Sequence, residues 1–238
     1  MNIEKGLERG VLYIVATPIG NNDDMSSRAR EILIACDRVA AEDTRRAARL
    51  LAELGGNQHK LISLHEHNED QLVDYLVGEL VKGVNVALVS DAGTPLLSDP
   101  GYRLVTAASS SGISVRPIPG PSSIIAALSV CPLPAHPFCF VGFLPKKKKE
   151  LHSRLQELIK KTEAVVFFES PRRIRRTLSL LSTLTDRKIF LIKEMTKTFE
   201  DSWSGSASEL LFQLDQDPKG EFVGVLEKVE LSELSLIH

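Results

Sequence analysis

Short apolar runs alternate with amphipathic stretches along the first half of the chain. Short apolar runs bounded by turn residues are typical of buried strands, and apolar positions recurring every three to four residues indicate helices. We expect strands at residues 11–16, 38–41, 61–64, 84–89 and 113–118. The helices expected between and after them span residues 26–35, 43–54, 68–81, 102–111 and 122–130. Repeated strand–helix units predict a mainly parallel sheet with helices on both faces.

Three prolines, Pro132, Pro134 and Pro137, interrupt this pattern. Proline does not extend a helix and restricts the residue before it, so we expect a linker here and two domains, 1–131 and 132–238. In the second domain, the pattern predicts strands at 138–143, 164–168, 188–194 and 221–229, with helices at 148–161, 172–184 and 206–214. The closing strands lie near one another in the sequence, which favours a mixed or antiparallel sheet. The expected fold is α/β with two domains, the first built on a parallel sheet and the second on a mixed one.

Composition and charge narrow the class of protein. The chain has 238 residues, 43% hydrophobic and 25% charged, which is ordinary for a soluble globular protein. The net charge is −2, but residues 142–200 carry 15 Lys/Arg against 7 Asp/Glu, a local excess of +8. This excess favours an anionic partner for the second half, the alternative being solvated helix faces.

Cysteine content and hydropathy indicate the compartment. The three cysteines form no CxxC pair, which favours buried thiols in a reducing compartment. No apolar run reaches 18 residues, so we expect a cytoplasmic protein without a membrane segment.

The most informative loop is Ser90-Asp91-Ala92-Gly93-Thr94-Pro95, directly after an apolar run. In open α/β sheets, ligands bind at the carboxyl ends of the strands. Small residues allow the backbone to approach a ligand, and the carboxylate of Asp91 can accept hydrogen bonds from hydroxyl or amino groups. Similar loops at 17–21, 119–123 and 142–145 suggest one shared ligand site. Neither a GxGxxG fingerprint nor a P-loop motif occurs, so a dinucleotide or P-loop site is poorly supported.

Nine sequence blocks support a specific resemblance. In chain order they are YIVATPIGN (13–21), AAEDTRR (40–46), SLHEHNE (63–69), VSDAGTPLLSDPGYRLV (89–105), PIPGPSS (117–123), VGFLPKK (141–147), FFESPRR (167–173), KEMTK (193–197) and KGEFVGV (219–225). With these blocks the chain resembles the bacterial ribosomal RNA 2′-O-methyltransferases that act on a cytidine of the small subunit, which are similar in fold to the tetrapyrrole methylases. The resemblance implies S-adenosylmethionine held between two α/β domains, small-subunit ribosomal RNA as partner, and a homodimer.

The resemblance also implies a set of cofactor-binding residues. They are Ile19, Gly20, Ser90, Asp91, Gly93, Thr94, Ser122, Ser123 and Phe168. Backbone amides at the helix start near Ser122 and Ser123 suit a carboxylate such as that of the methionine moiety. Ordinary turn and capping chemistry is the alternative explanation for Asp91 and Ser122.

Methyl transfer to a ribose hydroxyl is an in-line displacement in which positioning supplies much of the acceleration. A base near the 2′-hydroxyl helps to remove its proton. The candidates for base and orienting groups are Glu42, Asp43, Arg45 and Glu169, with a capping and ion-pair set as the alternative. The candidates for RNA phosphate contacts are Lys146, Lys147, Arg172, Arg173 and Arg176.

A metal site and two other functions are alternatives. His65-Glu66-His67 offers metal-binding side chains without an evident third ligand, and transfer from a sulfonium needs no metal, so we expect none. A tetrapyrrole-precursor C-methyltransferase shares the fold. A non-catalytic ribosome-binding protein that holds the cofactor is suggested by Asn22-Asp23, where the family has Leu-Gly, and by Arg172, where it often has His. The basic second half and the nine blocks favour RNA methylation.

Overall fold

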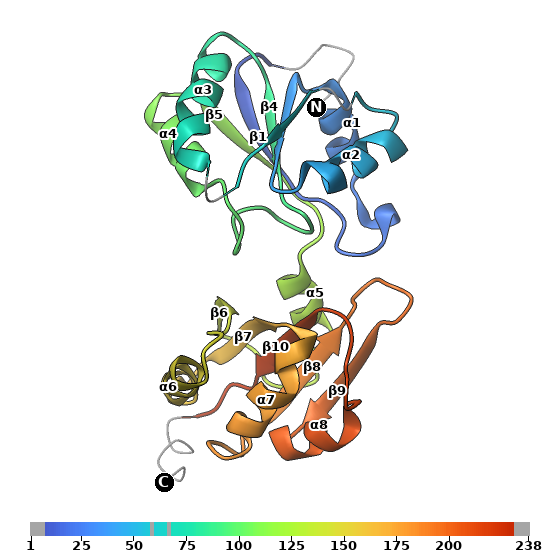
Figure 1. The fold of residues 1–238 in the computed structure, drawn as a ribbon, viewed down its shortest axis with the longest axis vertical. Helices are drawn as coiled ribbons and strands as arrows, with labels where there is room; N and C mark the ends of the chain where they lie inside the picture. Colours follow the sequence, from blue (N-terminus) through green and yellow to red (C-terminus); the bar gives the residue numbers. More distant parts are fainter. Residues whose placement is uncertain (1–7, 58–59, 66–67, 231–238) are drawn as a thin grey trace. The chain divides into compact units, whose positions relative to one another are not determined.

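The computed structural model describes residues 8–57, 60–65 and 68–230. The chain divides into two compact units, Met1–Ser122 and Ser123–His238, each with its own sheet (Figure 1). The sequence predicts a domain boundary between residues 131 and 132, whereas the two observed units meet between Ser122 and Ser123. The physical reason is that helix α5 (Ser123–Ser129) packs on strand β10 (Phe222–Leu226) of the second sheet. The proline-rich stretch therefore joins two elements of one unit.

The first unit is built on a five-stranded parallel sheet in the order β3-β2-β4-β1-β5. Its strands are β1 (Val11–Val15), β2 (Arg38–Ala41), β3 (Leu61–Ser63), β4 (Val86–Val89) and β5 (Ser114–Ile118). The expectation of a parallel sheet built from strand–helix units is confirmed.

Two helices cover each face of this sheet (Figure 1). They are α1 (Ser27–Ala35) and α2 (Thr44–Glu53) on one face, and α3 (Glu69–Val81) and α4 (Tyr102–Ser110) on the other, with a 3-10 turn η2 (Asn22–Asp24) before α1. Because neighbouring side chains of a strand point to opposite faces, Tyr13 packs with Ile32 and Leu51 in one core while Leu12 packs with Leu76 and Leu104 in the other.

Strands β1 and β4 are neighbours, but the chain leaves them toward opposite faces of the sheet, to α1 and to α4. Such a topological switch point opens a crevice at the carboxyl ends of the strands, where ligands bind in doubly wound folds. The fold therefore places the loops after β1 and β4 side by side.

A buried carboxylate fixes the far end of the β4–α4 loop. Glu69, at the start of α3, is 7% exposed and accepts hydrogen bonds from the backbone amides of Gly101 (3.1 Å) and Arg103 (3.0 Å). Gly101 has φ +117°, and a Cβ there would lie 2.5 Å from Cδ2 of Leu88. Glycine is therefore required at this entry to α4.

The second unit contains a mixed sheet in the order β6-β7-β10-β8-β9. Among the strands that the structure describes in this unit, β6 and β7 pair in parallel and the other neighbours pair antiparallel, which confirms the expected mixed sheet. The strands are β6 (Phe138–Phe143), β7 (Ala164–Glu169), β8 (Ile189–Lys193), β9 (Asp201–Gly205) and β10. Strand β9 is absent from the sequence prediction because its residues are mostly polar and exposed, and its pairing with β8 at the sheet edge is what makes it a strand.

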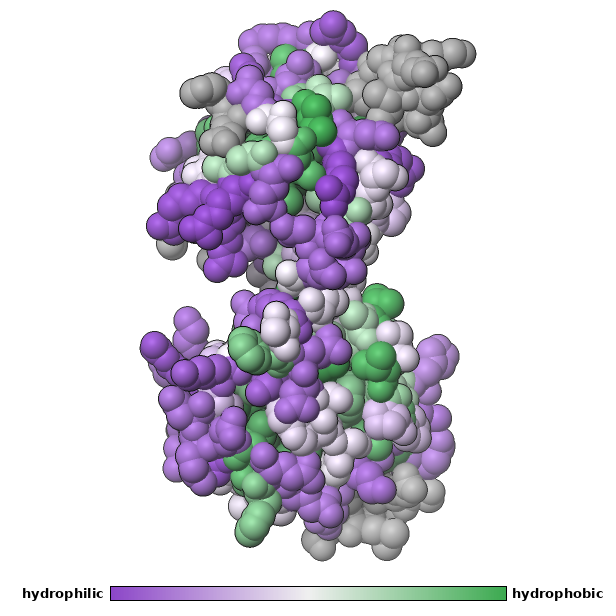
Figure 2. Space-filling model, turned by 90° about the vertical axis from the view of Figure 1, so that its right-hand side faces the viewer, coloured by the Kyte–Doolittle hydropathy of each residue, from purple (hydrophilic) through white to green (hydrophobic). Residues whose placement is uncertain are grey.

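Three helices pack against one face of the second sheet: α6 (Lys148–Leu158), α7 (Pro171–Leu181) and α8 (Ala207–Gln213). Their buried leucines and isoleucine, including Leu151, Ile174 and Leu210, form its main core. Hydrophilic side chains cover most of the face seen in Figure 2, but apolar ones also reach the surface of this unit. Ile125, Val130 and Phe143 are each more than half exposed.

In the part of the chain that the structure describes, every helix is too short or too polar to cross a membrane.

Candidate functional site

Two loops are paired directly at the switch point. The backbone amide of Thr17, after β1, donates to the carbonyl of Gly93 (2.9 Å), and the amide of Gly93, after β4, donates to the carbonyl of Thr17 (3.1 Å). The buried hydroxyl of Thr17 also donates to the carbonyl of Ser90 (3.3 Å). These hydrogen bonds thus tie the two loops together at the carboxyl ends of β1 and β4.

The loop after β5 joins them. The hydroxyl of Thr94 donates to the carbonyl of Pro121 (3.0 Å). Gly93 has φ +82°, and a Cβ there would lie 3.3 Å from Cγ2 of Ile19 and 3.7 Å from the carbonyl oxygen of Pro121. Three predicted cofactor loops therefore converge on Gly93, with Ser122 following directly after Pro121.

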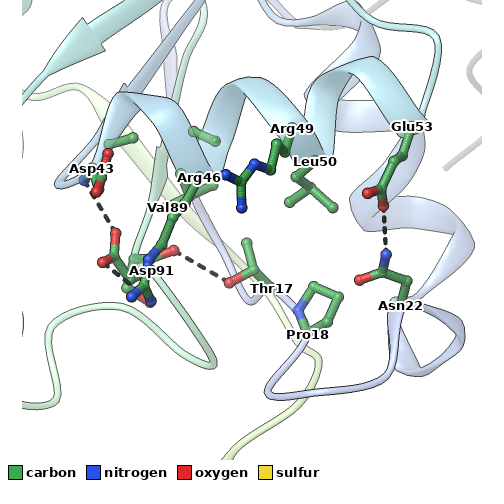
Figure 3. A pocket seen from close by; sticks show the side chains of 13 residues that line it. Thr17, Pro18, Asn22, Asp43, Arg46, Arg49, Leu50, Glu53, Val89 and Asp91 are labelled. Atoms are coloured by element: carbon green, nitrogen blue, oxygen red, sulfur yellow. Dashed lines mark hydrogen bonds and ion pairs between the residues drawn. The ribbon is translucent and has the colours of Figure 1, made fainter.

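A pocket of about 350 Å³ lies at the carboxyl ends of β1, β2 and β4, beside α2 (Figure 3). Thr17 and Pro18 line it from the first loop. The opposite wall is one face of α2, to which Arg46, Arg49, Leu50 and Glu53 belong. Residues 89–91, Asn22 and Asp43 are also among the lining residues. This volume is within the range of small-molecule binding sites.

Asp91 connects the β4 loop to the start of α2. Its Oδ1 accepts the backbone amide of Asp43 (3.1 Å), and its Oδ2 lies 3.5 Å from a guanidinium nitrogen of Arg46. Both carboxylate oxygens are therefore engaged by the protein, and the side chain stands 30% exposed at the pocket.

Asp43 and Arg45 form a helix cap and an ion pair, which is the alternative to a catalytic role for these two residues. Asp43 caps α2 by accepting the backbone amide of Arg45 (2.9 Å), and the Arg45 guanidinium donates to both carboxylate oxygens of Asp43 (3.0 and 2.7 Å). Hydrogen bonds from Arg45 hold the pKa of Asp43 well below its usual range. A carboxylate stabilised in this way is a weak proton acceptor.

Glu42 lies exposed just after β2, near a second carboxyl that the sequence prediction did not include. The pKa of Asp99 is raised to about 6, mainly by burial and also by the negative charges of Glu42 and Asp91, while a hydrogen bond with Ser90 lowers it. In the sequence, Asp99 lies in Ser98-Asp99-Pro100-Gly101, a composition that is typical of a turn and gives no sign of burial. Asp99 is thus a partly buried carboxyl of the β4–α4 loop whose pKa lies above that of an ordinary aspartate.

Glu169, at the end of β7 in the second unit, is buried, with its side chain 0% exposed. Its carboxylate accepts hydrogen bonds from the hydroxyl of Thr177 (2.8 Å) and the amide of Ser170 (2.7 Å), and it lies 2.6 Å from a guanidinium nitrogen of Arg173. Arg173 also donates to the carbonyl of Leu144 (2.9 Å). These contacts favour a structural role for the Glu169–Arg173 pair over the predicted catalytic and RNA-binding roles.

The other predicted RNA contacts lie at the exposed surface between β6 and α7. Arg176 donates to the carbonyl of Lys146 (2.8 Å), so it supports the loop that carries the lysines. Lys146, Lys147 and Arg172 are exposed, and Lys147 pairs with Glu150 (3.0 Å). Of the five predicted residues, Lys146 and Arg172 are therefore exposed without a described acidic partner, and Lys147 is exposed but paired with Glu150.

Ser123 and Phe168 belong to the second unit. Phe168 makes edge-to-face contacts with Phe140 and Phe143, with ring centroids 4.8 and 5.4 Å away. The roles of Ser123 and Phe168 at the cofactor remain predictions.

The metal hypothesis at residues 65–67 falls partly outside the described residues, since 66 and 67 are not among them. Within residues 8–57, 60–65 and 68–230, no group of three His, Cys, Asp or Glu side chains is placed to hold a metal ion.

The fold and the loop arrangement define the class of protein: an α/β protein of two units whose parallel sheet carries a pocket at its switch point. Comparison with known proteins then gives the family. Residues 11–211 match the model of the Tetrapyrrole (Corrin/Porphyrin) Methylases, and the chain belongs to that family.

Curated relatives share more than two fifths of the sequence. The chain is 45% identical over 223 residues to "Ribosomal RNA small subunit methyltransferase I" of Xylella fastidiosa (strain Temecula1 / ATCC 700964), covering 92% of this chain and 81% of that protein. It is 44% identical over 224 residues to the protein of the same name from Escherichia coli O157:H7, covering 92% and 78%.

Solved structures at low identity share the fold. Uroporphyrin-III-C-methyltransferase from Thermus thermophilus matches with a TM-score of 0.60 and 20% identity over 95% of this chain and 99% of that one. The precorrin-6Y methylase from Archaeoglobus fulgidus matches with a TM-score of 0.61 and 17% identity over 93% and 100%. The expected tetrapyrrole-methylase-like fold is confirmed.

Proposed function

We propose that the protein transfers a methyl group from S-adenosylmethionine to the ribose 2′-oxygen of a cytidine in small-subunit ribosomal RNA, in the cytoplasm. The observation that carries this proposal is the reciprocal pairing of Thr17 with Gly93, which joins two ligand-facing loops at the switch point of a methylase-family fold. The names of relatives that are 41–45% identical support ribosomal RNA as the substrate class.

The loops around Gly93 fit the cofactor. The absence of a side chain at Gly93 keeps open a space that a Cβ would fill against Ile19, and the neighbouring groups are small or polar. Ile19, Gly20, Ser90, Gly93, Thr94 and Ser122 of the first unit would hold S-adenosylmethionine, which supplies an electrophilic methyl group when bound. Asp91 fixes these loops against α2, and Ser123 and Phe168 complete the proposed set.

Glu42 and Asp99 are the groups proposed to accept the proton of the 2′-hydroxyl. As the ribose oxygen takes the methyl group, its proton goes to the carboxylate. A carboxyl with a pKa near the working pH balances the required protonation state against basicity. Asp43 and Arg45, which form an ion pair with each other, would orient the start of α2 and would not contact the reacting atoms.

The rate of single-turnover methylation is expected to fall as the pH drops through about 6, because Asp99 must be deprotonated to accept the proton. Asp99→Asn should remove this acid limb and lower the plateau rate. Rates are measured from pH 5 to 8, with Asp201→Asn, on the exposed strand β9, as the matched control. A wild-type rate and profile in Asp99→Asn would contradict the role, and Glu42→Gln tests Glu42 in the same assay.

Binding to RNA is expected to depend on the exposed cations Lys146, Lys147 and Arg172. Arg172→Glu should weaken binding most at low salt, and should reduce the slope of log affinity against log salt by about 0.7 for each lost contact to single-stranded RNA. Filter binding between 50 and 300 mM salt measures the slope. The same reversal at Lys82, beyond the end of α3 in the first unit, serves as control. A salt-insensitive affinity would count against this surface.

A homodimer is the proposed assembly. The family resemblance supports this proposal, and burial in an interface of side chains such as Ile125 and Phe143, each more than half exposed, would be favourable. Light scattering or sedimentation measures the mass in solution.

The function itself is tested by incubating the protein with methyl-labelled S-adenosylmethionine and small ribosomal subunits, followed by nuclease mapping. Label on the 2′-oxygen of one cytidine is expected. Label on a base or on protein would overturn the reaction, and turnover of a uroporphyrinogen or precorrin probe without RNA labelling would favour the tetrapyrrole alternative.

A further inference from the structure

One face of α2 presents a basic and an acidic side chain to the pocket. Arg49 and Glu53 are separated by one helical turn, and side chains at such i, i+4 positions are neighbours on the helix surface. Figure 3 shows both reaching toward the pocket, with Leu50 beside them and Pro18 across the opening. On this face of α2, a basic and an acidic group thus lie next to apolar surface of the pocket.

The hydrogen-bonding state of the two groups differs. Oε2 of Glu53 accepts a hydrogen bond from the side-chain amide of Asn22. Arg49 makes no ion pair or hydrogen bond to any described residue and is exposed. One carboxylate oxygen of Glu53 thus already accepts from the amide of Asn22, while the guanidinium of Arg49 has its N–H donors available to a ligand.

These groups match the edge of one pyrimidine base. Cytosine presents an amino group at N4 beside acceptors at N3 and O2. Carboxylates accept from the N4 amino group, and a guanidinium donates a planar fork of N–H groups to adjacent acceptors. Uracil has a carbonyl at position 4 and an N–H at position 3. In the same position, its carbonyl oxygen would face the carboxylate and its N–H would face the guanidinium, so neither pair could form a hydrogen bond. Leu50 and Pro18 offer apolar contacts to the faces of the ring.

We infer that this pocket binds the target cytosine base, with Glu53 accepting from N4 and Arg49 donating to N3 and O2. The inference rests on the proposed ribose methylation and adds the residues that select the base. The pocket lies beside the Thr17–Gly93 pairing, so a nucleotide held here has its sugar near the proposed cofactor loops of the same unit.

The test compares methylation of short small-subunit RNA carrying either cytidine or uridine at the mapped position. Arg49→Ala is expected to raise the KM for cytidine RNA by about fivefold to 150-fold, the range for loss of one base-specific pair. Glu53→Gln is expected to narrow the preference for cytidine over uridine, because an amide can donate to the uracil carbonyl. Affinity for S-adenosylmethionine, measured by calorimetry, should stay unchanged in both variants.

Lys82→Ala, which removes an exposed cation beyond the end of α3, is the control for loss of charge. Both pocket residues are exposed, and thermal unfolding verifies that the variants remain folded. An unchanged preference for cytidine in Glu53→Gln, together with an unchanged KM in Arg49→Ala, would overturn the inference while leaving the ribose methylation intact. A selective loss of affinity for S-adenosylmethionine would assign the pocket to the cofactor instead. Absence of ribose methylation by the unaltered protein would overturn the proposed function and this inference with it.

Discussion

Replacing Glu169 by alanine is expected to destabilise the second unit by about 3–5 kcal/mol, the range for removing one partner of a buried ion pair. The Glu169 side chain is fully buried, and its carboxylate is the partner of Arg173, Ser170 and Thr177. Its loss leaves the guanidinium of Arg173, which is 15% exposed, without the charge that compensates its burial. Because Arg173 also holds the carbonyl of Leu144, the loop before α6 should loosen as well.

Thermal and urea unfolding measure this effect. Glu157→Ala is the matched control, since Glu157 pairs with Arg154 at the surface of α6 and exposed pairs contribute only about 0–1 kcal/mol. If Glu169→Ala unfolds like the unaltered protein but loses single-turnover methylation, the structural assignment is wrong and Glu169 returns as a catalytic base.

The second large effect is expected from Gly93→Ala, which should reduce methylation on the order of 100-fold. Alanine at φ +82° costs about 1–2 kcal/mol, and its methyl group would press on Ile19 and approach Pro121. The loops after β1, β4 and β5 meet at this residue, so their separation shifts every proposed cofactor contact. Misplacement of reacting groups by about 1 Å is sufficient for a loss of this size.

Gly112→Ala separates backbone strain from the local effect. Gly112 has φ +70°, and a Cβ there meets nothing within 4 Å, so the substitution carries a similar conformational cost at a site away from the loops. Calorimetric titration with S-adenosylmethionine and the methylation rate should change in Gly93→Ala and stay near normal in Gly112→Ala. Equal losses in both variants would contradict the proposed cofactor role of the Gly93 loops.

Local patterning was sufficient for most of the architecture. The apolar runs that became β1 and β4 are buried from both sides, and a fully buried strand has a recognisable composition wherever it pairs. Strand β9 could not be found in this way because its polar, exposed residues gain their extended structure from pairing with β8. The boundary between the two units differs from the predicted one for a related reason. Helix α5 belongs to the second unit because it packs on β10, a strand about one hundred residues later in the chain.

The same distinction between local pattern and long-range contacts applies to the residues of the candidate site. The small-residue loop at 90–95 was identified from its composition and its place after a strand. The engagement of Glu169 with Arg173, by contrast, depends on how deeply the end of β7 is buried, and residue type alone did not indicate this. Asp99 was missed because its raised pKa follows from burial and from Glu42, which is distant in sequence.

The sequence by itself determined the strand–helix order, the loops that face a ligand and the resemblance to a methylase family, because each is written in contiguous residues. Only the tertiary structure decided which side chains are available for chemistry. Arg173 is held by Glu169 and by the carbonyl of Leu144, whereas Arg49 lines a pocket without an ion pair or hydrogen bond to any described residue, although both are arginines on a helix. Burial, hydrogen-bond partners and electrostatic neighbours arise from contacts between distant segments, and those contacts set whether a charge supports the fold or meets a ligand.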